Sequence, residues 1–281
     1  MSAESGFSGA ESERVESEIT ERSASELLED EEALKDYTVV TFGTGGDKAP
    51  EDKIGVASAR RLGKLVTGEM GMSGASGGFD VGAMKAYTEG LTEGLQERGK
   101  TDQSEEYIYS IPLGKDVIDL PSVQGATTES ISILPDRKAA LQKKGSAFIA
   151  VAGSAGTFDE LLSTMTEEGL YARANRPEAL PYDRPIIIVD PTLRHTDSIR
   201  AIARVNGEKA KAVGKLGPTY VVNDDADVVK SILETYYLMA HKENLSEEDQ
   251  QELGQRLQDL EQYKLTAFLD ENKINEEGGG I

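Results

Sequence analysis

The sequence contains no cysteine, no tryptophan and only two histidines in 281 residues. The absence of cysteine excludes a disulfide framework, a thiolate zinc site, an iron–sulfur cluster and a cysteine nucleophile. Two imidazoles, His195 and His241, are too few for a histidine-rich metal site and make a Ser-His-Asp triad an unfavourable interpretation. We therefore expect no thiolate or histidine-rich metal site.

Long apolar runs and an excess of positive charge are also missing. No run of about 18 apolar residues could cross a bilayer, and the N-terminus lacks a basic segment followed by an apolar stretch. These absences predict a cytoplasmic protein with no membrane partner. The chain carries 51 acidic and 30 basic residues, a net charge of −21. Binding to DNA or RNA requires a surplus of Lys and Arg, so no nucleic-acid partner is expected.

The acidic charge is concentrated at the two ends of the chain. Residues 1–36 hold 12 acids and 3 bases, residues 242–281 hold 11 acids and 4 bases, and the middle has a net charge of only −5. The sequence thus predicts an acidic N-terminal extension (1–36) that is weakly helical or disordered, a domain (37–241), and an acidic C-terminal helix with a flexible end (242–281).

Sparse apolar positions in the two extensions indicate helices that pack on something else. Leu27 and Leu34 belong to a thin apolar stripe in the first extension. In the second, Ser246 with Asp249 resembles an N-cap, and leucines recur at near-helical spacing from Leu253. We expect this C-terminal helix to pack on its own domain or on a sister subunit, with a partner-binding helix as the alternative.

Short β-rich runs alternate with helical patterns through the middle of the chain. Strands are expected at 37–42, 70–73, 107–111, 131–133, 147–151, 185–189 and 220–222. Helices are expected at 52–66, from Asp80 as the cap, at 136–143, from about 155, and at 226–241. Strands that are apolar on both faces and separated by helices predict an α/β fold, a Rossmann-like doubly wound parallel sheet with helices on both faces.

Three glycine-rich turns follow predicted strands, where ligands of such sheets bind. They are Gly43-Thr44-Gly45-Gly46, Ser73-Gly74-Ala75-Ser76-Gly77-Gly78, and Gly153-Ser154-Ala155-Gly156-Thr157. Glycine lets a backbone approach a ligand closely, and the free amides at a helix start favour a phosphate. Each turn taken alone also suits an ordinary tight connection. Neither GxGxxG at the first turn nor GxxxxGK[ST] occurs, which disfavours nicotinamide enzymes and P-loop nucleotidases.

The third turn and its surroundings resemble a known family. Residues 152–160 (AGSAGTFDE) resemble the signature PGGxGTxxE, residues 77–84 (GGFDVGAM) resemble GGGxxGLM, and Arg137-Lys138 resembles an RK pair ahead of the signature strand. Together they resemble the LOG family of the SLOG superfamily, nucleoside-monophosphate phosphoribohydrolases that activate cytokinins and are often mislabelled lysine decarboxylases. The resemblance covers about residues 37–240. Ala152, Ser154 and Phe79 depart from the family pattern, and a larger side chain at 79 would narrow or reshape the pocket.

The resemblance implies hydrolysis of the N-glycosidic bond of a nucleoside 5′-monophosphate to free base and ribose 5-phosphate, with Glu160 and Arg137 as the catalytic residues. A carboxylate near the ribose can stabilise an oxocarbenium-like sugar and orient a water molecule. The amides of the third turn would hold the phosphate, and Arg137 would neutralise part of its charge. This hydrolysis requires no metal ion or other cofactor. The candidate nucleotide-binding residues are Gly43, Thr44, Gly45, Gly77, Gly78, Gly82, Met84, Lys138, Gly153, Ser154, Gly156, Thr157 and Asp159. The resemblance also implies a homodimer or higher homo-oligomer.

Other interpretations remain open at this point. Glu160 lies in the first turn of a helix, where acids are favoured by the helix dipole alone, and Arg137 could be an exposed base at a helix start. His195 fits a surface loop. The departures at 79, 152 and 154 suggest, as the alternative function, a non-catalytic nucleotide-binding module or a molybdenum-cofactor-carrier-like module on the same fold. A third hypothesis is a scaffold whose acidic extensions bind a partner.

Overall fold

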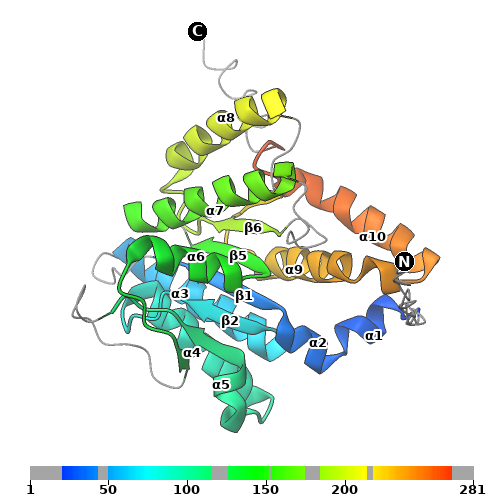
Figure 1. Ribbon diagram of the computed structural model, residues 1–281, viewed down its shortest axis with the longest axis horizontal. Helices are drawn as coiled ribbons and strands as arrows, with labels where there is room; N and C mark the ends of the chain where they lie inside the picture. Colours follow the sequence, from blue (N-terminus) through cyan, green and yellow to red (C-terminus); the bar gives the residue numbers. More distant parts are fainter. Residues whose placement is uncertain are drawn as a thin grey trace, which may run out of the picture.

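In the part of the chain that the structure describes, seven strands form one sheet in which all neighbouring strands are parallel (Figure 1). The computed structural model describes residues 21–43, 50–114, 126–151, 153–174, 184–213 and 218–267. The strands are β1 (Thr38–Phe42), β2 (Ser73–Ser76), β3 (Ile108–Ser110), β4 (Thr127–Thr128), β5 (Ala147–Val151), β6 (Ile186–Val189) and β7 (Thr219–Val222), in the order β4-β3-β2-β1-β5-β6-β7. The predicted Rossmann-like α/β fold is confirmed.

Helices connect and cover the strands. They are α1 (Ala24–Leu28), α2 (Glu31–Asp36), α3 (Pro50–Lys64), α4 (Gly82–Glu97), α5 (Ser104–Tyr107), α6 (Leu134–Lys144), α7 (Ala155–Ala174), α8 (Thr196–Val213), α9 (Ala226–Ala240) and α10 (Glu247–Asp259). A π-helical turn, Leu65–Glu69, continues α3, and the 3-10 turn η4 (Leu260–Tyr263) follows α10. None of the described helices is long and apolar enough to cross a membrane.

Alternating residues of the central strands pack in two separate hydrophobic cores. Val39 of β1 and Ile149 of β5 pack in a cluster with side chains of α3, α4 and α9. Their neighbours Val40 and Phe148 belong to a second cluster, with side chains of α6, α7 and α8. Because strand side chains point alternately to opposite faces, the sheet is covered by helices on both sides, as predicted.

The strand order reverses between β1 and β5. From β1 the chain runs outward through β2, β3 and β4, and from β5 it runs outward through β6 and β7 in the other direction. The two strands pair in register, with Phe42 opposite Ala150. Ligands of open parallel sheets bind in the crevice at the carboxyl ends of strands where the order reverses. The loops after β1 and β5 are therefore where a site is expected.

The described parts of both flanks, residues 21–36 and 242–267, pack on this domain, and the flexible end predicted for the C-terminus lies outside the described residues. Leu27 of α1 and Leu34 of α2 are buried in the same cluster as α9, and Leu253 of α10 is buried there as well. The flanks also meet each other, because Arg22 forms a parallel bridge with Leu245. The predicted helices in both flanks are present and pack on the domain. The division into a domain and two extensions stays a prediction.

Three local predictions were wrong. Residues 73–76, expected to open a glycine turn, form β2 itself, because they pair with both β1 and β3. Asp80 does not cap α4; it forms an ion pair with Lys85, and Val81 stands at the cap without a side-chain hydrogen bond. The strand expected at 131–133 is reduced to one bridge between Ile131 and Leu113, and Ile133 is the N-cap residue of α6.

Candidate functional site

The candidate site lies at the carboxyl edge of the sheet, where three elements bring charged and small residues together. The loop after β2 supplies Gly77, Gly78 and Phe79, the first turn of α6 supplies Arg137, and the first turns of α7 supply Glu160. Each of these segments follows or precedes a strand whose neighbours are fixed by the register of the sheet. The chain thus converges on one place from residues more than 80 positions apart.

Arg137 is the centre of this arrangement. Its side chain is only 6% exposed, and its Nη1 donates a hydrogen bond to Glu160 Oε1 over 2.9 Å. Its Nε donates to the backbone carbonyl of Ile111, just after β3, also over 2.9 Å. The alternative of an exposed helix-start base is therefore wrong. Burying a guanidinium is costly unless it is paired and hydrogen-bonded, and here a carboxylate and a carbonyl accept two of its five N–H groups.

Glu160 is mostly buried, with 15% of its side chain exposed. Burial raises the pKa of its carboxyl above the ordinary value, and the charge and hydrogen bond of Arg137 oppose that shift. The rise shows that the loss of water around the carboxylate outweighs the attraction of its partner. A buried glutamate with a shifted pKa beside a fixed cation is typical of functional sites.

The glycines after β2 make room for the guanidinium. A Cβ atom on Gly77 would lie 2.0 Å from Arg137 Nη2 and 2.8 Å from Met84 Sδ. Gly78 has a φ of +73°, and a Cβ there would lie 2.1 Å from Ser110 Oγ. Side chains at either position would displace the loop or Arg137. The glycines that the sequence singled out are thus required by close approach and by backbone conformation.

Phe79 covers the guanidinium from another side. Its ring centroid lies 5.8 Å from Arg137 Cζ, within cation–π range, and the residue is 5% exposed. The larger side chain at this position therefore occupies space beside the charged pair, as the departure from the family pattern led us to expect. It also restricts the orientations open to Arg137.

The residues on either side of the central pair form a second, more exposed ion pair. Lys138 Nζ contacts Asp159 Oδ2, with the lysine side chain 17% and the aspartate side chain 58% exposed. Both belong to the predicted binding residues. The two pairs lie side by side in the sequence of α6 and α7, so they join the starts of these helices twice.

The turn after β5 leads directly into α7. The amide of Phe158 donates to the carbonyl of Ser154, and Thr157 is 2% exposed with a buried hydroxyl that has no hydrogen-bond partner among the described residues. Gly156 is not crowded, since a Cβ there would meet nothing closer than Ser154 Oγ at 3.7 Å. Free helix-start amides and an unpartnered hydroxyl are suited to hold an anion.

The remaining predicted residues divide into placed and undescribed positions. Gly43 lies against the start of α4, where a Cβ would be 2.7 Å from Ala83 Cβ, and Gly82 begins that helix with a φ of +54°. Gly153 follows β5. Thr44, Gly45 and Ala152 lie outside the described residues. The structure therefore brings Gly77, Met84, Arg137 and Glu160 into contact, while the roles of all candidate residues stay predictions.

Sequence reasoning missed two groups that shape the site. The carbonyl of Ile111 fixes Arg137, and the buried hydroxyl of Ser110, which has no hydrogen-bond partner in the described parts of the chain, lies against Gly78. Their only sequence signal was their place at the end of an expected strand. A backbone carbonyl acts through geometry, so no residue type identifies it in advance.

The fold and site define a Rossmann-like protein with glycine-rich turns and a buried Arg–Glu pair at the carboxyl edge of its sheet. Residues 90–232 match the family described as "possible lysine decarboxylase", and the chain belongs to that family. This assignment agrees with the resemblance to the LOG family. A search of curated proteins found no significant match.

Several solved structures resemble the chain at low identity. One is the molybdenum cofactor binding protein from the phototrophic bacterium Rippkaea orientalis, at 14% identity with a TM-score of 0.46, covering 70% of this chain and 97% of that one. Another is the molybdenum cofactor carrier protein from Chlamydomonas reinhardtii, at 14% identity with a TM-score of 0.47, covering 71% of this chain and 97% of that one. At 14% identity, the activities and ligands of these proteins are not carried over to this chain.

Proposed function

We propose that this chain is a LOG-type nucleoside 5′-monophosphate phosphoribohydrolase, which releases a free base and ribose 5-phosphate. The observation that carries the proposal is the buried Arg137–Glu160 pair beside glycine turns at the carboxyl edge of the sheet. Membership of the family described as possible lysine decarboxylase supports it. Hydrolysis of this kind needs a carboxylate near the sugar and hydrogen-bond donors for the phosphate. Glu160 and the start of α7 are the candidates for these two parts.

In the proposed reaction, the bond between C1′ of the ribose and the base nitrogen breaks, and its electron pair leaves with the base. The sugar then carries developing positive charge, which the ionised carboxylate of Glu160 stabilises. A water oxygen forms the new bond to C1′, and a proton from that water passes to the departing base. Glu160 is placed to accept and transfer this proton, and burial, which raises its pKa above the ordinary value, makes it a better proton acceptor.

The 5′-phosphate is assigned to the start of α7. The free amides of Gly156 and Thr157 and the unpartnered hydroxyl of Thr157 supply donors there. Arg137 already donates to Glu160 and to the carbonyl of Ile111, so its main part in the proposal is to hold the carboxylate. Lys138 is the more exposed cation and would neutralise phosphate charge by exchanging its contact with Asp159.

The decisive experiment compares two glutamate variants on the same helix. Purified wild-type protein is incubated with purine nucleoside 5′-monophosphates, and free base and ribose 5-phosphate are separated by chromatography. Glu160→Gln should lower the rate by about 100-fold or more, as expected when a proton-transferring group is lost. Glu167→Gln, further along α7, should leave the rate unchanged. A wild-type protein that binds these nucleotides and never releases base would defeat the proposal.

A second candidate function is a non-catalytic module that binds a nucleotide or the molybdenum cofactor. The observation favouring it is Phe79, a buried residue that departs from the family pattern and packs on the guanidinium of Arg137. Thermal-shift measurements with nucleotides and with the pterin cofactor separate the two functions, because a ligand that binds only the folded state raises the melting temperature. A shift with the pterin alone would favour the carrier and exclude the hydrolase.

We also propose that the protein is a homo-oligomer. Ile133 and Leu134 at the start of α6 and Leu162 on α7 are large apolar side chains that are 57%, 42% and 43% exposed, and their burial would favour association. Light scattering coupled to size exclusion should give at least twice the chain mass, and Leu162→Asp should lower it. Ile54→Asp, at a similarly exposed leucine-sized position on α3, is the matched control.

A further inference from the structure

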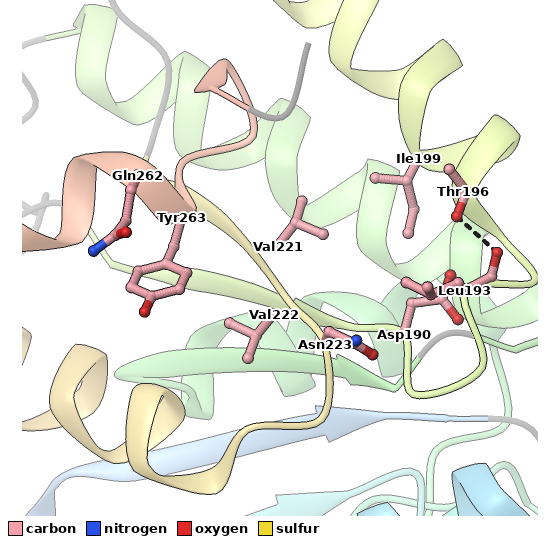
Figure 2. A pocket seen from close by; sticks show the side chains of 9 residues that line it. All are labelled: Asp190, Leu193, Thr196, Ile199, Val221, Val222, Asn223, Gln262 and Tyr263. Atoms are coloured by element: carbon pink, nitrogen blue, oxygen red, sulfur yellow. Dashed lines mark hydrogen bonds between the residues drawn. The ribbon is translucent and has the colours of Figure 1, made fainter. Parts of the chain in front are cut away.

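A cavity of about 250 Å³ opens at the carboxyl ends of β6 and β7 (Figure 2). Three segments build it: the loop after β6 with the start of α8, the end of β7, and η4. Figure 2 shows Asp190 beside Asn223, with Ile199 and Thr196 coming from α8 and Tyr263 from η4. None of the described candidates for the proposed phosphoribohydrolase site lines this cavity.

A buried carboxylate is the main polar feature of the cavity. Asp190 is 2% exposed; one of its oxygens accepts the amide of His195 over 3.0 Å, and the other accepts the hydroxyl of Thr192 over 3.3 Å. Two neutral donors leave further lone pairs on both oxygens. No Lys or Arg is among the lining residues, and in the described part of the chain no ion pair is formed by Asp190.

The rest of the lining combines aliphatic and aromatic side chains with three polar ones, Thr196, Asn223 and Gln262. The Thr196 hydroxyl donates to the carbonyl of Leu193, and the Gln262 amide donates to the carbonyl of Asp259. Ile199, Val221 and Val222 give aliphatic walls, and Tyr263 adds an aromatic ring. Within the described residues, the side-chain amide of Asn223 makes no hydrogen bond, and Asn223 neighbours Asp190, whose amide donates to the carbonyl of Val222 over 3.1 Å. A carboxylate beside an amide, next to the aliphatic and aromatic side chains of the lining, matches a ligand with donors at one end of an apolar body.

We propose that this cavity binds a small molecule that presents adjacent N–H donors, as on an amidine or an amino-substituted heterocycle, on a flat apolar body. Paired N–H donors satisfy a carboxylate with two parallel, charge-assisted hydrogen bonds. An anion is excluded because it would meet a buried carboxylate with no cation to offset it. The volume limits the ligand to one or two rings. The site would therefore accept a base-like or amidine-like compound and reject a phosphate.

The charge rule is tested in wild-type protein with a pair of probes of the same shape. Benzamidine carries two adjacent N–H donors and a positive charge, whereas benzoate has the same size and shape with a negative charge. Amide resonances followed by two-dimensional NMR should shift on addition of benzamidine at the residues after β6 and β7 and in η4. Benzoate should leave them in place. Equal binding of the two probes, or benzamidine shifts confined to other surfaces, would overturn the proposal.

Two matched variants test the carboxylate itself. Asp190→Asn keeps an oxygen that can accept the amide of His195 and removes the charge, so the benzamidine affinity should fall by about tenfold or more. Asp197→Asn makes the same change nearby on α8, on a side chain that is 97% exposed, and should keep the wild-type affinity. Affinity that survives Asp190→Asn in a folded protein contradicts the proposal. If that variant fails to fold, the comparison of benzamidine with benzoate in the wild type decides.

Discussion

Arg137 connects Glu160 to the end of β3. Its guanidinium donates to the carboxylate of Glu160 and to the carbonyl of Ile111, each over 2.9 Å, so a helix-borne cation, a second helix and a strand end are held together by one side chain. The pair lies at the edge of the sheet that carries the glycine turns. The contribution of this pair to the free energy of unfolding, to the pH dependence of stability and to activity can each be measured separately.

Removal of Arg137 should destabilise the protein strongly. Arg137→Met leaves the carboxylate of Glu160 buried without its cation, and breaking a buried pair in this way costs about 3–5 kcal/mol of the free energy of unfolding. Urea denaturation followed by circular dichroism measures it. Lys138→Ala, the neighbouring residue in a more exposed pair, should cost less than about 1 kcal/mol. Similar losses in the two variants would contradict the assigned burial of Arg137.

Glu160 should make the protein less stable as the pH rises. Its folded-state pKa lies above the ordinary value of 4.5 because of burial. Between these two pH values the folded state binds more protons than the unfolded state, so the free energy of unfolding falls with increasing pH. The free energy of unfolding of the wild type should therefore fall relative to that of Glu160→Gln as the pH rises from acidic to neutral. Urea denaturation over this pH range measures both values.

Glu26 provides the opposite slope as a control for that experiment. The backbone amide and hydroxyl of Ser23 hold the pKa of its carboxyl below the ordinary value. Its contribution to stability is thus present above pH 4.5 and is lost as the pH falls through the folded-state pKa. The wild type should gain relative to Glu26→Gln as the pH rises. Parallel slopes for the two glutamates would show that the direction assigned to Glu160 is wrong.

The sequence was sufficient for the fold because its main signals are local. The apolar runs that become β5 and β6 are buried on both faces, and such runs between helical patterns indicate a parallel sheet. The strand Ser73–Ser76 was misplaced because small and glycine residues have weak β propensity, and pairing with β1 and β3 on both sides overrides it. Propensity carries no information about a neighbour supplied by a distant segment.

The sequence identified candidate residues of the site, but it predicted only part of their arrangement in space. Glu160 and Arg137 were identified through the motif resemblance, and the structure pairs them. The burial of Arg137 depends on the carbonyl of Ile111 and the ring of Phe79, which reach it from other elements. The cavity beside Asp190 had no motif at all, because it is formed where three segments with ordinary sequences meet.

The N-terminal flank should unfold together with the domain. Leu27 is 1% exposed in the core shared with α9, and Tyr237 Oη donates to its carbonyl over 3.1 Å. Leu27→Ala should cost about 2–5 kcal/mol, the usual range for a buried leucine. Leu28→Ala, at the adjacent and only partly buried position, should cost less. A fully retained melting temperature in Leu27→Ala would mean that α1 is not docked in solution.

Gly78 should tolerate alanine less well than Gly99, although both have a similar left-handed backbone. Their φ angles are +73° and +68°. A Cβ on Gly99 would meet nothing within 4 Å, so Gly99→Ala should cost only the backbone strain of about 1–2 kcal/mol. At Gly78 the new methyl group also collides with Ser110 Oγ at 2.1 Å and with Pro112 Cδ at 3.0 Å, which adds about 1–3 kcal/mol.

The two contributions at Gly78 can be separated by a second change. Ser110 Oγ has no hydrogen-bond partner among the described residues, so Ser110→Gly removes the colliding atom without breaking a hydrogen bond seen in the structure. In the double variant the cost of Gly78→Ala should therefore fall towards the Gly99→Ala value, with a remainder from Pro112. Chemical denaturation of the four proteins gives the coupling energy directly. Additive losses would show that a methyl group at position 78 does not collide with Ser110 of β3. Glycine would then be required at position 78 for its backbone conformation alone.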